Sequence, residues 1–224
     1  MRRNSAKAEL YHRATVIREE LGIKRREPVV SSVDILNRLP FLAIESQPFR
    51  TRALHGVCSF GRDGDIDVIV LSSHRTAIEQ NFDCMHEYFH LHEHRNEKKD
   101  AFYCYENVQS KQNRFLEWQA NEGAAEILMP YKEFIPLFLH FHKYQKTDRY
   151  FPLIDALAAC YCVTTAMVEN RIRSLSYEIY QYEKGCPLDQ IELLSGNQQQ
   201  KRNIVSPDYL ARCTFPMGWN DYIG

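Results

Sequence analysis

The 224-residue sequence has no long apolar run. Its longest apolar stretches, which include Ile135 to Leu139 and Leu157 to Val163, are short and interrupted, well below the roughly 20 residues that span a bilayer. The opening Met1-Arg2-Arg3-Asn4 is followed by a charged helical pattern, whereas a secretory signal needs an apolar segment at that place. These absences argue against membrane insertion and export, and we expect a soluble, cytoplasmic protein.

An excess of charge of either sign is also missing. Lys and Arg total 28 against 29 Asp and Glu, which gives a net charge of -1. Such a balance provides no long-range attraction toward nucleic acid or an anionic membrane. A nucleic-acid function would therefore depend on a local basic patch.

Cysteines at the spacing of zinc knuckles or thioredoxin-like redox sites are absent. The chain has seven cysteines, an odd number, and no C-x-x-C pair, so reduced thiols are expected. Cys160 and Cys162 are the closest pair. Residues two apart on a helix point in different directions, which favours a structural role for both.

The periodicity of apolar residues predicts an α+β fold that is mostly helical. With 44% hydrophobic residues, the chain is long enough for one full core. Short β-type runs predict a small sheet with a hairpin, and residues 92 to 114 are rich in charges and amides, which predicts a solvated loop. The expected strands are Phe41 to Ile44, Val57 to Phe60 and Ile66 to Leu71; the expected helices lie at about 10–21, 31–40, 78–90, 115–129, 131–145, 152–161 and 164–182.

The segment His86-Glu87-Tyr88-Phe89-His90 is an H-E-x-x-H motif on one of these predicted helices. Ile78, Phe82, Met85 and Phe89 give this helix an apolar stripe. Residues four apart differ by about 40° of rotation and one turn of rise, so both imidazoles can reach one metal ion. Glu87 lies about 100° from His86, where it can contact a water on the metal without binding the metal itself.

A catalytic zinc takes three protein ligands and keeps one position open, so a third ligand is needed. Glu93 and Asn96 occupy positions where the metzincin pattern requires Gly and His, which excludes that class. His94 lies two turns from His86, roughly 12 Å of rise, too far to share an ion with it.

A carboxylate from the helix at about 115–129 is the best third ligand. We choose Glu117 over Glu122 and Glu126, because its helical face continues through Asn121 and small or apolar residues that allow close packing. Glu122 lies about 140° away around the helix. The predicted site is therefore one Zn²⁺ held by His86, His90 and Glu117.

The motifs in this order resemble the ImmA/IrrE family of metallopeptidases. The similarity covers about residues 5 to 180 and depends on three segments: His86-Glu87-x-x-His90; Glu117-x-x-Ala120-Asn121 running into Ile127-Leu128-Met129-Pro130; and the helical pattern from Leu157 to Leu175. The resemblance implies a zincin-like domain at residues 1–180, with residues 181–224 as a C-terminal tail. It also implies a regulatory endopeptidase that cleaves a helix-turn-helix repressor.

Two segments of these motifs depart from the family pattern. Tyr88-Phe89 stands where Leu-Gly is common, and Gly123-Ala124 stands where Phe-Ala is usual. These changes alter packing near the cleft and leave the ligand types unchanged. We expect metal binding to be kept and the range of substrates to differ.

The site predicts hydrolysis of a peptide bond by metal-activated water. Zinc lowers the pKa of water from near 16 toward about 7, and Glu87 takes the proton as general base and returns it to the leaving amine. A further oxyanion donor is not assigned. Its candidates are Tyr88, His92, His94 and His142.

Residues 152–175 resemble a helix-turn-helix, with Ala166 to Leu175 as the second helix. A DNA-binding regulator is therefore one alternative function, and a catalytically silent scaffold stabilised by metal is another. Glu169 lies beside Arg171 and Arg173 in a nearly neutral chain, which argues against direct nucleic-acid binding. The sequence leaves the oligomeric state and the function of the tail open.

Overall fold

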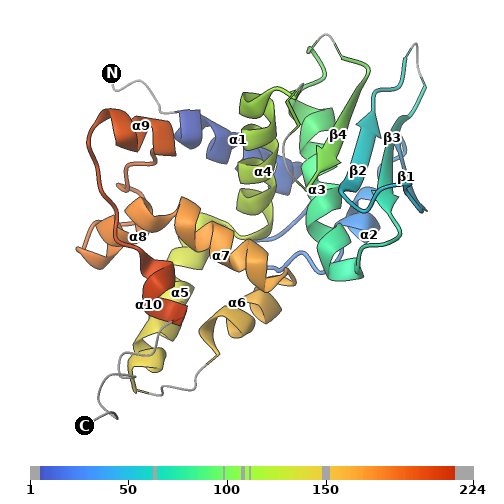
Figure 1. Cartoon of the computed structure of the whole chain (residues 1–224). Coiled ribbons are helices and arrows are strands. Elements are labelled where there is room, and N and C mark those ends of the chain that lie inside the picture. The colour runs from blue at the N-terminus through green and yellow to red at the C-terminus, as the bar shows by residue number, and fades with distance from the viewer. Residues whose placement is uncertain are drawn as a thin grey trace. The chain divides into compact units, whose positions relative to one another are not determined.

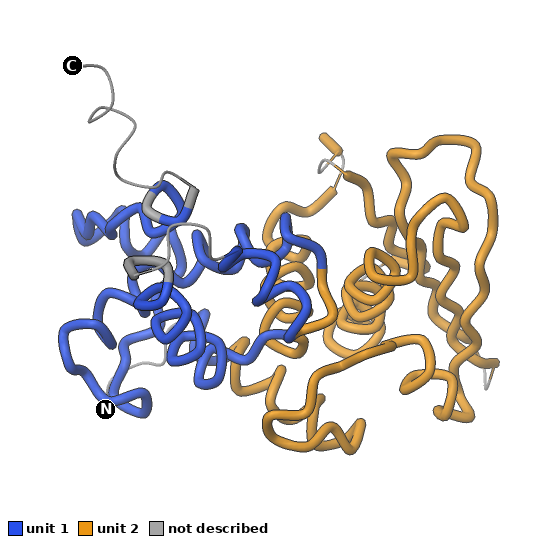
Figure 2. The backbone as a smooth tube through the Cα atoms, turned by 90° about the horizontal axis from the view of Figure 1, so that it is seen from below, with its two compact units in different colours: residues 1–9, 129–160, 164–224 blue, residues 10–128, 161–163 orange. Residues whose placement is uncertain are grey.

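The computed structural model describes residues 6–62, 65–97, 99–106, 109–110, 112–147 and 152–214. The chain forms two compact units, which Figure 2 distinguishes by colour. Unit 1 comprises residues 1–9, 129–160 and 164–224, and unit 2 comprises residues 10–128 and 161–163. The domain boundary at residue 180 stays a prediction, and the end of the predicted tail, residues 215–224, lies outside the described residues.

Unit 2 contains a four-stranded mixed sheet with the order β1-β3-β2-β4 (Figure 1). Its strands are β1 (Leu42–Gln47), β2 (Leu54–Ser59), β3 (Asp67–Ser72) and β4 (Ala101–Tyr105). Strand β1 runs parallel to β3, while β2 is antiparallel to both β3 and β4. The predicted α+β class, mostly helical with a small sheet, is confirmed.

Strand β4 corrects the prediction of a solvated loop across residues 92 to 114. Phe102 and Cys104 are buried while Tyr103 between them is 48% exposed, the alternation of a strand with one buried face. Strand β4 pairs with β2 over Leu54 to Ser59. Charged residues on both sides of this five-residue run made the sequence look like a loop. The run forms a strand because it pairs with a strand far away along the chain.

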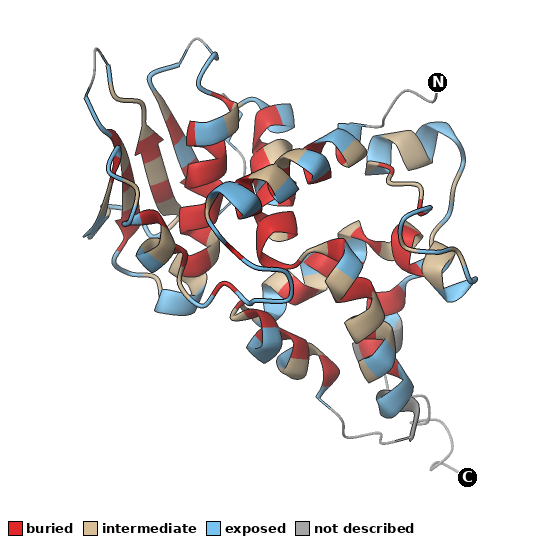
Figure 3. Cartoon of the chain, turned by 180° about the vertical axis from the view of Figure 1, so that it is seen from behind, coloured by how far each residue is buried: buried red, intermediate tan, exposed pale blue. Residues whose placement is uncertain are grey.

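Helix α3 (Ala77–Glu93) packs against the sheet and against α4 (Arg114–Leu128). Thr76 and Glu79 form a capping box that fixes the first turn of α3. Residues in the second half of α3 are buried almost without interruption, as Figure 3 shows. The prediction of this helix is confirmed, but Ile78 of its expected apolar stripe is 52% exposed.

The shorter helices of the N-terminal half follow the predicted pattern. Helix α1 (Ala6–Glu20) ends before Gly22, whose φ of +68° is the left-handed conformation expected of a C-terminal glycine cap. Helix α2 (Ser32–Leu36) begins after Ser31, whose side chain accepts a hydrogen bond from the Asp34 amide. Each of these two helices therefore has one end fixed by a local cap.

Buried Asn81 fixes α3 within unit 2 through four hydrogen bonds. Its side-chain oxygen accepts from the Ser32 amide and the Ser32 hydroxyl, each at 2.7 Å. Its side-chain amide donates to the carbonyl oxygens of Val29 and Cys162, at 2.8 and 2.9 Å. Since a buried amide must be satisfied in full, these contacts define the position of α3 against α2 and residues 161–163.

The two motif departures noted in the sequence meet at the contact between α3 and α4. A Cβ atom added to Gly123 would lie 2.2 Å from Cε2 of Phe89, and the Phe89 ring is fully buried. The large ring is therefore on α3, and the glycine on α4 leaves room for it. The resembling family usually has the opposite arrangement, glycine at position 89 and phenylalanine at position 123.

Most of unit 1 is helical. Its elements are α5 (Tyr131–Thr147), α6 (Leu153–Tyr161, of which Tyr161 belongs to unit 2), α7 (Thr165–Ser174), α8 (Ser176–Glu183), α9 (Gly196–Lys201) and α10 (Tyr209–Thr214). The predicted helix at 164–182 is divided into α7 and α8 at Leu175. Among the described residues, no helix is long and apolar enough to cross a membrane.

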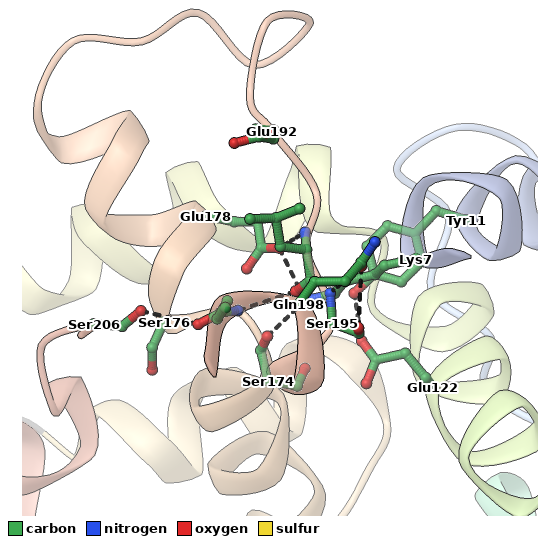
Figure 4. Close-up of polar contacts among 12 residues, drawn as sticks. Lys7, Tyr11, Glu122, Ser174, Ser176, Glu178, Glu192, Ser195, Gln198 and Ser206 are labelled. Carbon is green, nitrogen blue, oxygen red and sulfur yellow. Dashed lines mark hydrogen bonds and ion pairs between the residues drawn. The ribbon is translucent and has the colours of Figure 1, made fainter. Parts of the chain in front are cut away.

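A buried ion pair joins distant parts of unit 1 (Figure 4). Lys7 Nζ lies 3.0 Å from Glu178 Oε1 and donates to the Ser174 carbonyl at 2.6 Å. The same Glu178 oxygen accepts from the Leu194 amide at 3.2 Å. Both charged side chains are almost completely buried, so loss of either partner would leave an uncompensated charge at a cost of about 3–5 kcal/mol.

The exchange of ring and glycine between α3 and α4 predicts strongly non-additive stabilities. Gly123→Phe alone should destabilise unit 2 by overpacking, at about 1–3 kcal/mol or more, and Phe89→Gly alone by about 3–5 kcal/mol through a cavity. The double variant should be more stable than the sum of the two losses by at least about 1 kcal/mol. Urea unfolding at a fixed metal concentration measures this coupling, and additive losses would contradict it.

Candidate metal centre

Three potential metal ligands converge in unit 2. His86 and His90 lie one turn apart on α3, and their Nε2 atoms are 3.2 Å apart. Glu117 on the first turn of α4 places Oε2 at 3.6 Å from His86 Nε2 and 3.7 Å from His90 Nε2. All three residues are buried. Helical spacing explains the two histidines, and packing of α4 on α3 supplies the carboxylate.

The spacing of these atoms fits a single metal ion. Zinc–ligand bonds of about 2.0–2.1 Å at tetrahedral angles place neighbouring ligand atoms about 3.3 Å apart, and the two imidazole nitrogens are separated by 3.2 Å. Two imidazole nitrogens and one carboxylate are a common ligand set of catalytic zinc. The three residues present are therefore suited to a divalent metal with one coordination position left open.

The second ring nitrogen of each histidine has an acceptor that fixes the tautomer. His86 Nδ1 donates to Asn121 Oδ1 at 3.1 Å. His90 Nδ1 lies 2.8 Å from Nδ1 of His94, whose Nε2 in turn lies 3.2 Å from Gln119 Oε1. Because each Nδ1 carries the ring proton and donates it away from the site, each Nε2 keeps a free lone pair that is directed at the metal position.

The electrostatics of the ligands also suit a cation. Burial lowers the pKa of His90 to about 3, so its imidazole is neutral at physiological pH and its lone pair is available. Burial by itself raises the pKa of Glu117, but the His86 and His90 side chains beside it outweigh burial and lower that pKa to about 2. Glu117 is thus a carboxylate at any physiological pH.

Glu87 is fully buried beside the ligands, and neither of its carboxylate oxygens has a hydrogen-bond partner among the described residues. Burial raises its pKa to about 7, partly opposed by the nearby His86. A Cβ added to Gly56 on β2 would lie 2.8 Å from Glu87 Oε1, so glycine leaves the room that the carboxylate occupies. An unsatisfied buried carboxylate costs free energy, which is typical of a functional site.

The remaining polar residues considered in the sequence have other partners. His94 is buried and contacts His90, in agreement with its exclusion as a ligand. His92 lies 2.9 Å from Glu93 and 2.8 Å from Glu20. Glu122 accepts a hydrogen bond from the Tyr11 hydroxyl, which Figure 4 also draws.

Glu126 and His142 belong to none of the described groups of residues that could hold a metal ion. Glu126 is buried on α4, Tyr88 is buried on α3, and His142 belongs to α5 of unit 1.

Sequence reasoning missed two residues beside the site, Gly56 and Cys104. Cys104 Sγ lies within 4.8 Å of a ring nitrogen of His86 and a carboxylate oxygen of Glu87. Both residues belong to strands whose pairing brings Gly56 opposite Cys104. The run Ala101-Phe102-Tyr103-Cys104-Tyr105, with its strand-forming residues, was the signal that could have placed Cys104 on the buried face.

The second helix of the helix-turn-helix-like segment turns one of its two arginines inward. Arg171 on α7 is 1% exposed and donates from Nε to the Met129 carbonyl at 3.1 Å. Arg173 contacts Asn170 at 2.9 Å and Glu169 at 3.5 Å. The basic side chains that a DNA reader would present are thus engaged within unit 1.

The chain belongs to the Peptidase_M78 family, described as the IrrE N-terminal-like domain, whose model matches residues 38–173. This membership confirms the ImmA/IrrE resemblance and makes the chain a member of a metallopeptidase family. The match includes both helices that carry the candidate ligands.

A Mycobacterium tuberculosis transcriptional regulator is similar in structure, with 18% sequence identity and a TM-score of 0.43. The similarity covers 75% of this chain and 47% of that chain, so this chain spans less than half of that protein. No curated protein sequence matches the chain.

Glu117→Gln should weaken metal binding by more than tenfold, because the amide oxygen is a neutral and poorer ligand than a carboxylate. Glu122→Gln, on the same helix and also buried, should leave metal binding unchanged. Elemental analysis after dialysis should find one zinc per chain in the wild type and in Glu122→Gln. Metal retained by Glu117→Gln and lost from Glu122→Gln would contradict the ligand assignment.

His94→Ala should weaken zinc binding by about 10- to 100-fold, because His90 loses the acceptor that fixes its tautomer. His94→Gln, whose carbonyl oxygen can accept the same hydrogen bond, should recover part of the affinity. His92→Ala is the matched control two residues away and should bind zinc like the wild type. Competition with a chromogenic chelator measures all four affinities; equal losses in the His94→Ala and His92→Ala variants would refute the positioning role.

Proposed function

We propose that this chain is a zinc-dependent endopeptidase. His86, His90 and Glu117 hold the metal, and Glu87 is the general base. The observation that carries the proposal is the pairing of two features. Three suitable metal ligands converge at one point, and a buried carboxylate with no hydrogen-bond partner among the described residues stands next to them.

Bound zinc supplies Lewis acidity, which polarises a peptide carbonyl and makes water more acidic. The chain's own contribution to proton transfer is the Glu87 carboxylate. It removes a proton from the attacking water at one of its oxygens and then delivers that proton to the leaving amine. Burial raises the pKa of this carboxyl group above its ordinary value, toward the neutral range in which a group can both accept and give up a proton.

Neighbouring residues keep these groups in position. Asn121 and His94 orient the two imidazoles through their Nδ1 atoms. Phe102 on β4 stacks on His90, with the ring centres 4.2 Å apart and the planes 19° apart, which shields that ligand from water. Exclusion of water strengthens the electrostatic interactions on which the reaction depends.

The substrate we propose is a folded repressor of the helix-turn-helix type, cut at one exposed linker in the cytoplasm. Membership of the IrrE-like family supports this choice. Exposed aromatic side chains occur on elements that also contribute to the site: Tyr103 on β4 is 48% exposed, and Phe115 on α4 is 55% exposed. Such side chains favour docking of a protein surface over capture of a small molecule.

The DNA-binding regulator is disfavoured as an alternative because Arg171 is buried and Arg173 is engaged. A metal-stabilised scaffold without activity would need the same three ligands but would have no use for an unpartnered Glu87. The two remaining functions therefore make different predictions for the Glu87→Gln variant.

Glu87→Gln should keep its zinc and its fold and lose at least about 10²-fold in hydrolysis, because an amide cannot accept the proton. The assay incubates the zinc-loaded wild type and the variant with a repressor encoded beside this chain, and identifies fragments by mass spectrometry. Unfolded casein is the second substrate. A single cut in the repressor and intact casein are expected from the wild type.

Three outcomes separate the functions. Equal cleavage by wild type and Glu87→Gln would remove Glu87 from the mechanism. Many cuts in casein and none in the repressor would refute the substrate. Zinc-loaded, folded wild-type protein that cleaves neither would favour the scaffold.

A further inference from the structure

Gln112, which lies two residues before the start of α4, contacts the candidate ligand Glu117. Its side-chain nitrogen Nε2 donates a hydrogen bond to Glu117 Oε1 at 3.1 Å. The other carboxylate oxygen, Oε2, is the one that lies 3.6 and 3.7 Å from the Nε2 atoms of His86 and His90. The two oxygens of Glu117 therefore have separate partners. One faces the metal position, and the other is held by Gln112.

The same nitrogen of Gln112 also binds the sheet. It donates to the main-chain carbonyl oxygen of Tyr103 at 2.6 Å. Tyr103 belongs to β4, which lies at one edge of the sheet (Figure 1), so that among the described residues no strand pairs with its outer side. A side-chain amide nitrogen carries two N–H donors. One of them is directed at the strand and the other at Glu117, and Gln112 thereby joins β4 to α4 beside the metal position.

The contacts of Gln112 define the orientation of its amide group. Its oxygen Oε1 accepts a hydrogen bond from the main-chain N–H of Gln109 at 2.6 Å. If the amide were turned over, its oxygen would face the Tyr103 carbonyl and the Glu117 carboxylate, and its nitrogen would face another donor. All of these contacts would then be repulsive. The donor therefore faces Glu117, and partners on both sides of the amide hold it in one conformation.

Strand β4 thus supports two ligands in two different ways. The Phe102 ring stacks on His90 of α3. The next residue, Tyr103, holds Gln112 through its carbonyl oxygen, and Gln112 in turn holds Glu117 of α4. One short strand therefore positions a histidine with a side chain and a carboxylate with its main chain.

We propose that Gln112 is a positioning residue of the metal centre, which holds the Glu117 carboxylate so that one oxygen alone faces the metal. A carboxylate can bind a cation through one oxygen or through both. Binding through both would use the coordination position that a catalytic zinc keeps open. Donation to Oε1 prevents this and orients the ligand before the metal binds. The inference rests on the proposed function, because it takes Glu117 to be a metal ligand.

Gln112→Met tests the proposal, because it keeps the approximate length of the side chain and removes both donors. Gln112 is half-buried, so unit 2 should stay folded. Zinc binding should weaken by about 10- to 100-fold, the loss typical of an outer partner of a ligand. Competition with a series of chelators of graded affinity measures this loss, and circular dichroism checks the fold.

Asn113→Ala is the matched control for a purely structural effect at the start of α4. Asn113 Oδ1 accepts from the main-chain amides of Phe115 and Leu116, at 3.0 and 3.4 Å. Its removal should destabilise the first turn of the helix and leave the contact between Gln112 and Glu117 in place. This variant should therefore unfold at a lower urea concentration and, while folded, bind zinc like the wild type.

A double-mutant cycle shows whether Gln112 acts through Glu117. In the Glu117→Ala background, Gln112→Met should no longer change the affinity for zinc, because the carboxylate that Gln112 positions is gone. An equal loss in both backgrounds, or the same loss in Asn113→Ala, would overturn the positioning role, since the effect would then be one on the fold.

Failure of this inference and failure of the proposed function give different results. Equal zinc affinities of Gln112→Met and the wild type would overturn the positioning role and leave the endopeptidase proposal intact. Zinc bound as tightly by Glu117→Ala as by the wild type would refute the ligand assignment, and both proposals would fail.

Discussion

Four ionisable side chains buried at one place dominate the energetics of unit 2. His86, Glu87, His90 and Glu117 are at most 4% exposed, and burial of charge is costly unless opposite charge is present. A bound divalent cation offsets that free-energy cost, because the lone pairs of the ligand atoms coordinate the cation instead of repelling one another. Since the unfolded chain has no such site, the free energy of metal binding adds to the stability of the fold, and chain and metal are expected to fold as one cooperative system.

The surrounding architecture has the task of holding unfavourable groups in place. Asn81 fixes the position of α3 with four hydrogen bonds, His94 and Asn121 fix the two rings, and Gly56 leaves a space for Glu87. None of these residues needs to contact a substrate. Their effect is preorganisation, which removes the cost of rearrangement at the moment of reaction.

Features that depend on helical periodicity were predictable from the sequence, and those that depend on pairing between distant strands were not. Apolar residues at spacings of three and four predicted two helices, and these helices carry His86, His90 and Glu117. The structure brings these three residues together. Strand β4 was missed because its short run of strand-forming residues lies between charged and amide-rich segments that are typical of a loop. Cys104 was missed with it, and so was Gly56, whose relation to Glu87 exists only once β2 lies against α3. The inward orientation of Arg171 likewise depends on Met129, 42 residues away.

The exchange between Phe89 and Gly123 restricts the evolutionary paths between this chain and the common family pattern. A Cβ atom added at position 123 lies 2.2 Å from the Phe89 ring. Phenylalanine at both positions would therefore cause steric overlap between α3 and α4. An ancestor with glycine at both positions would carry a cavity, which costs stability but can be tolerated in a fold strengthened by bound metal. The contact between α3 and α4 therefore has room for one ring, and bound metal would offset part of the cost of a cavity there.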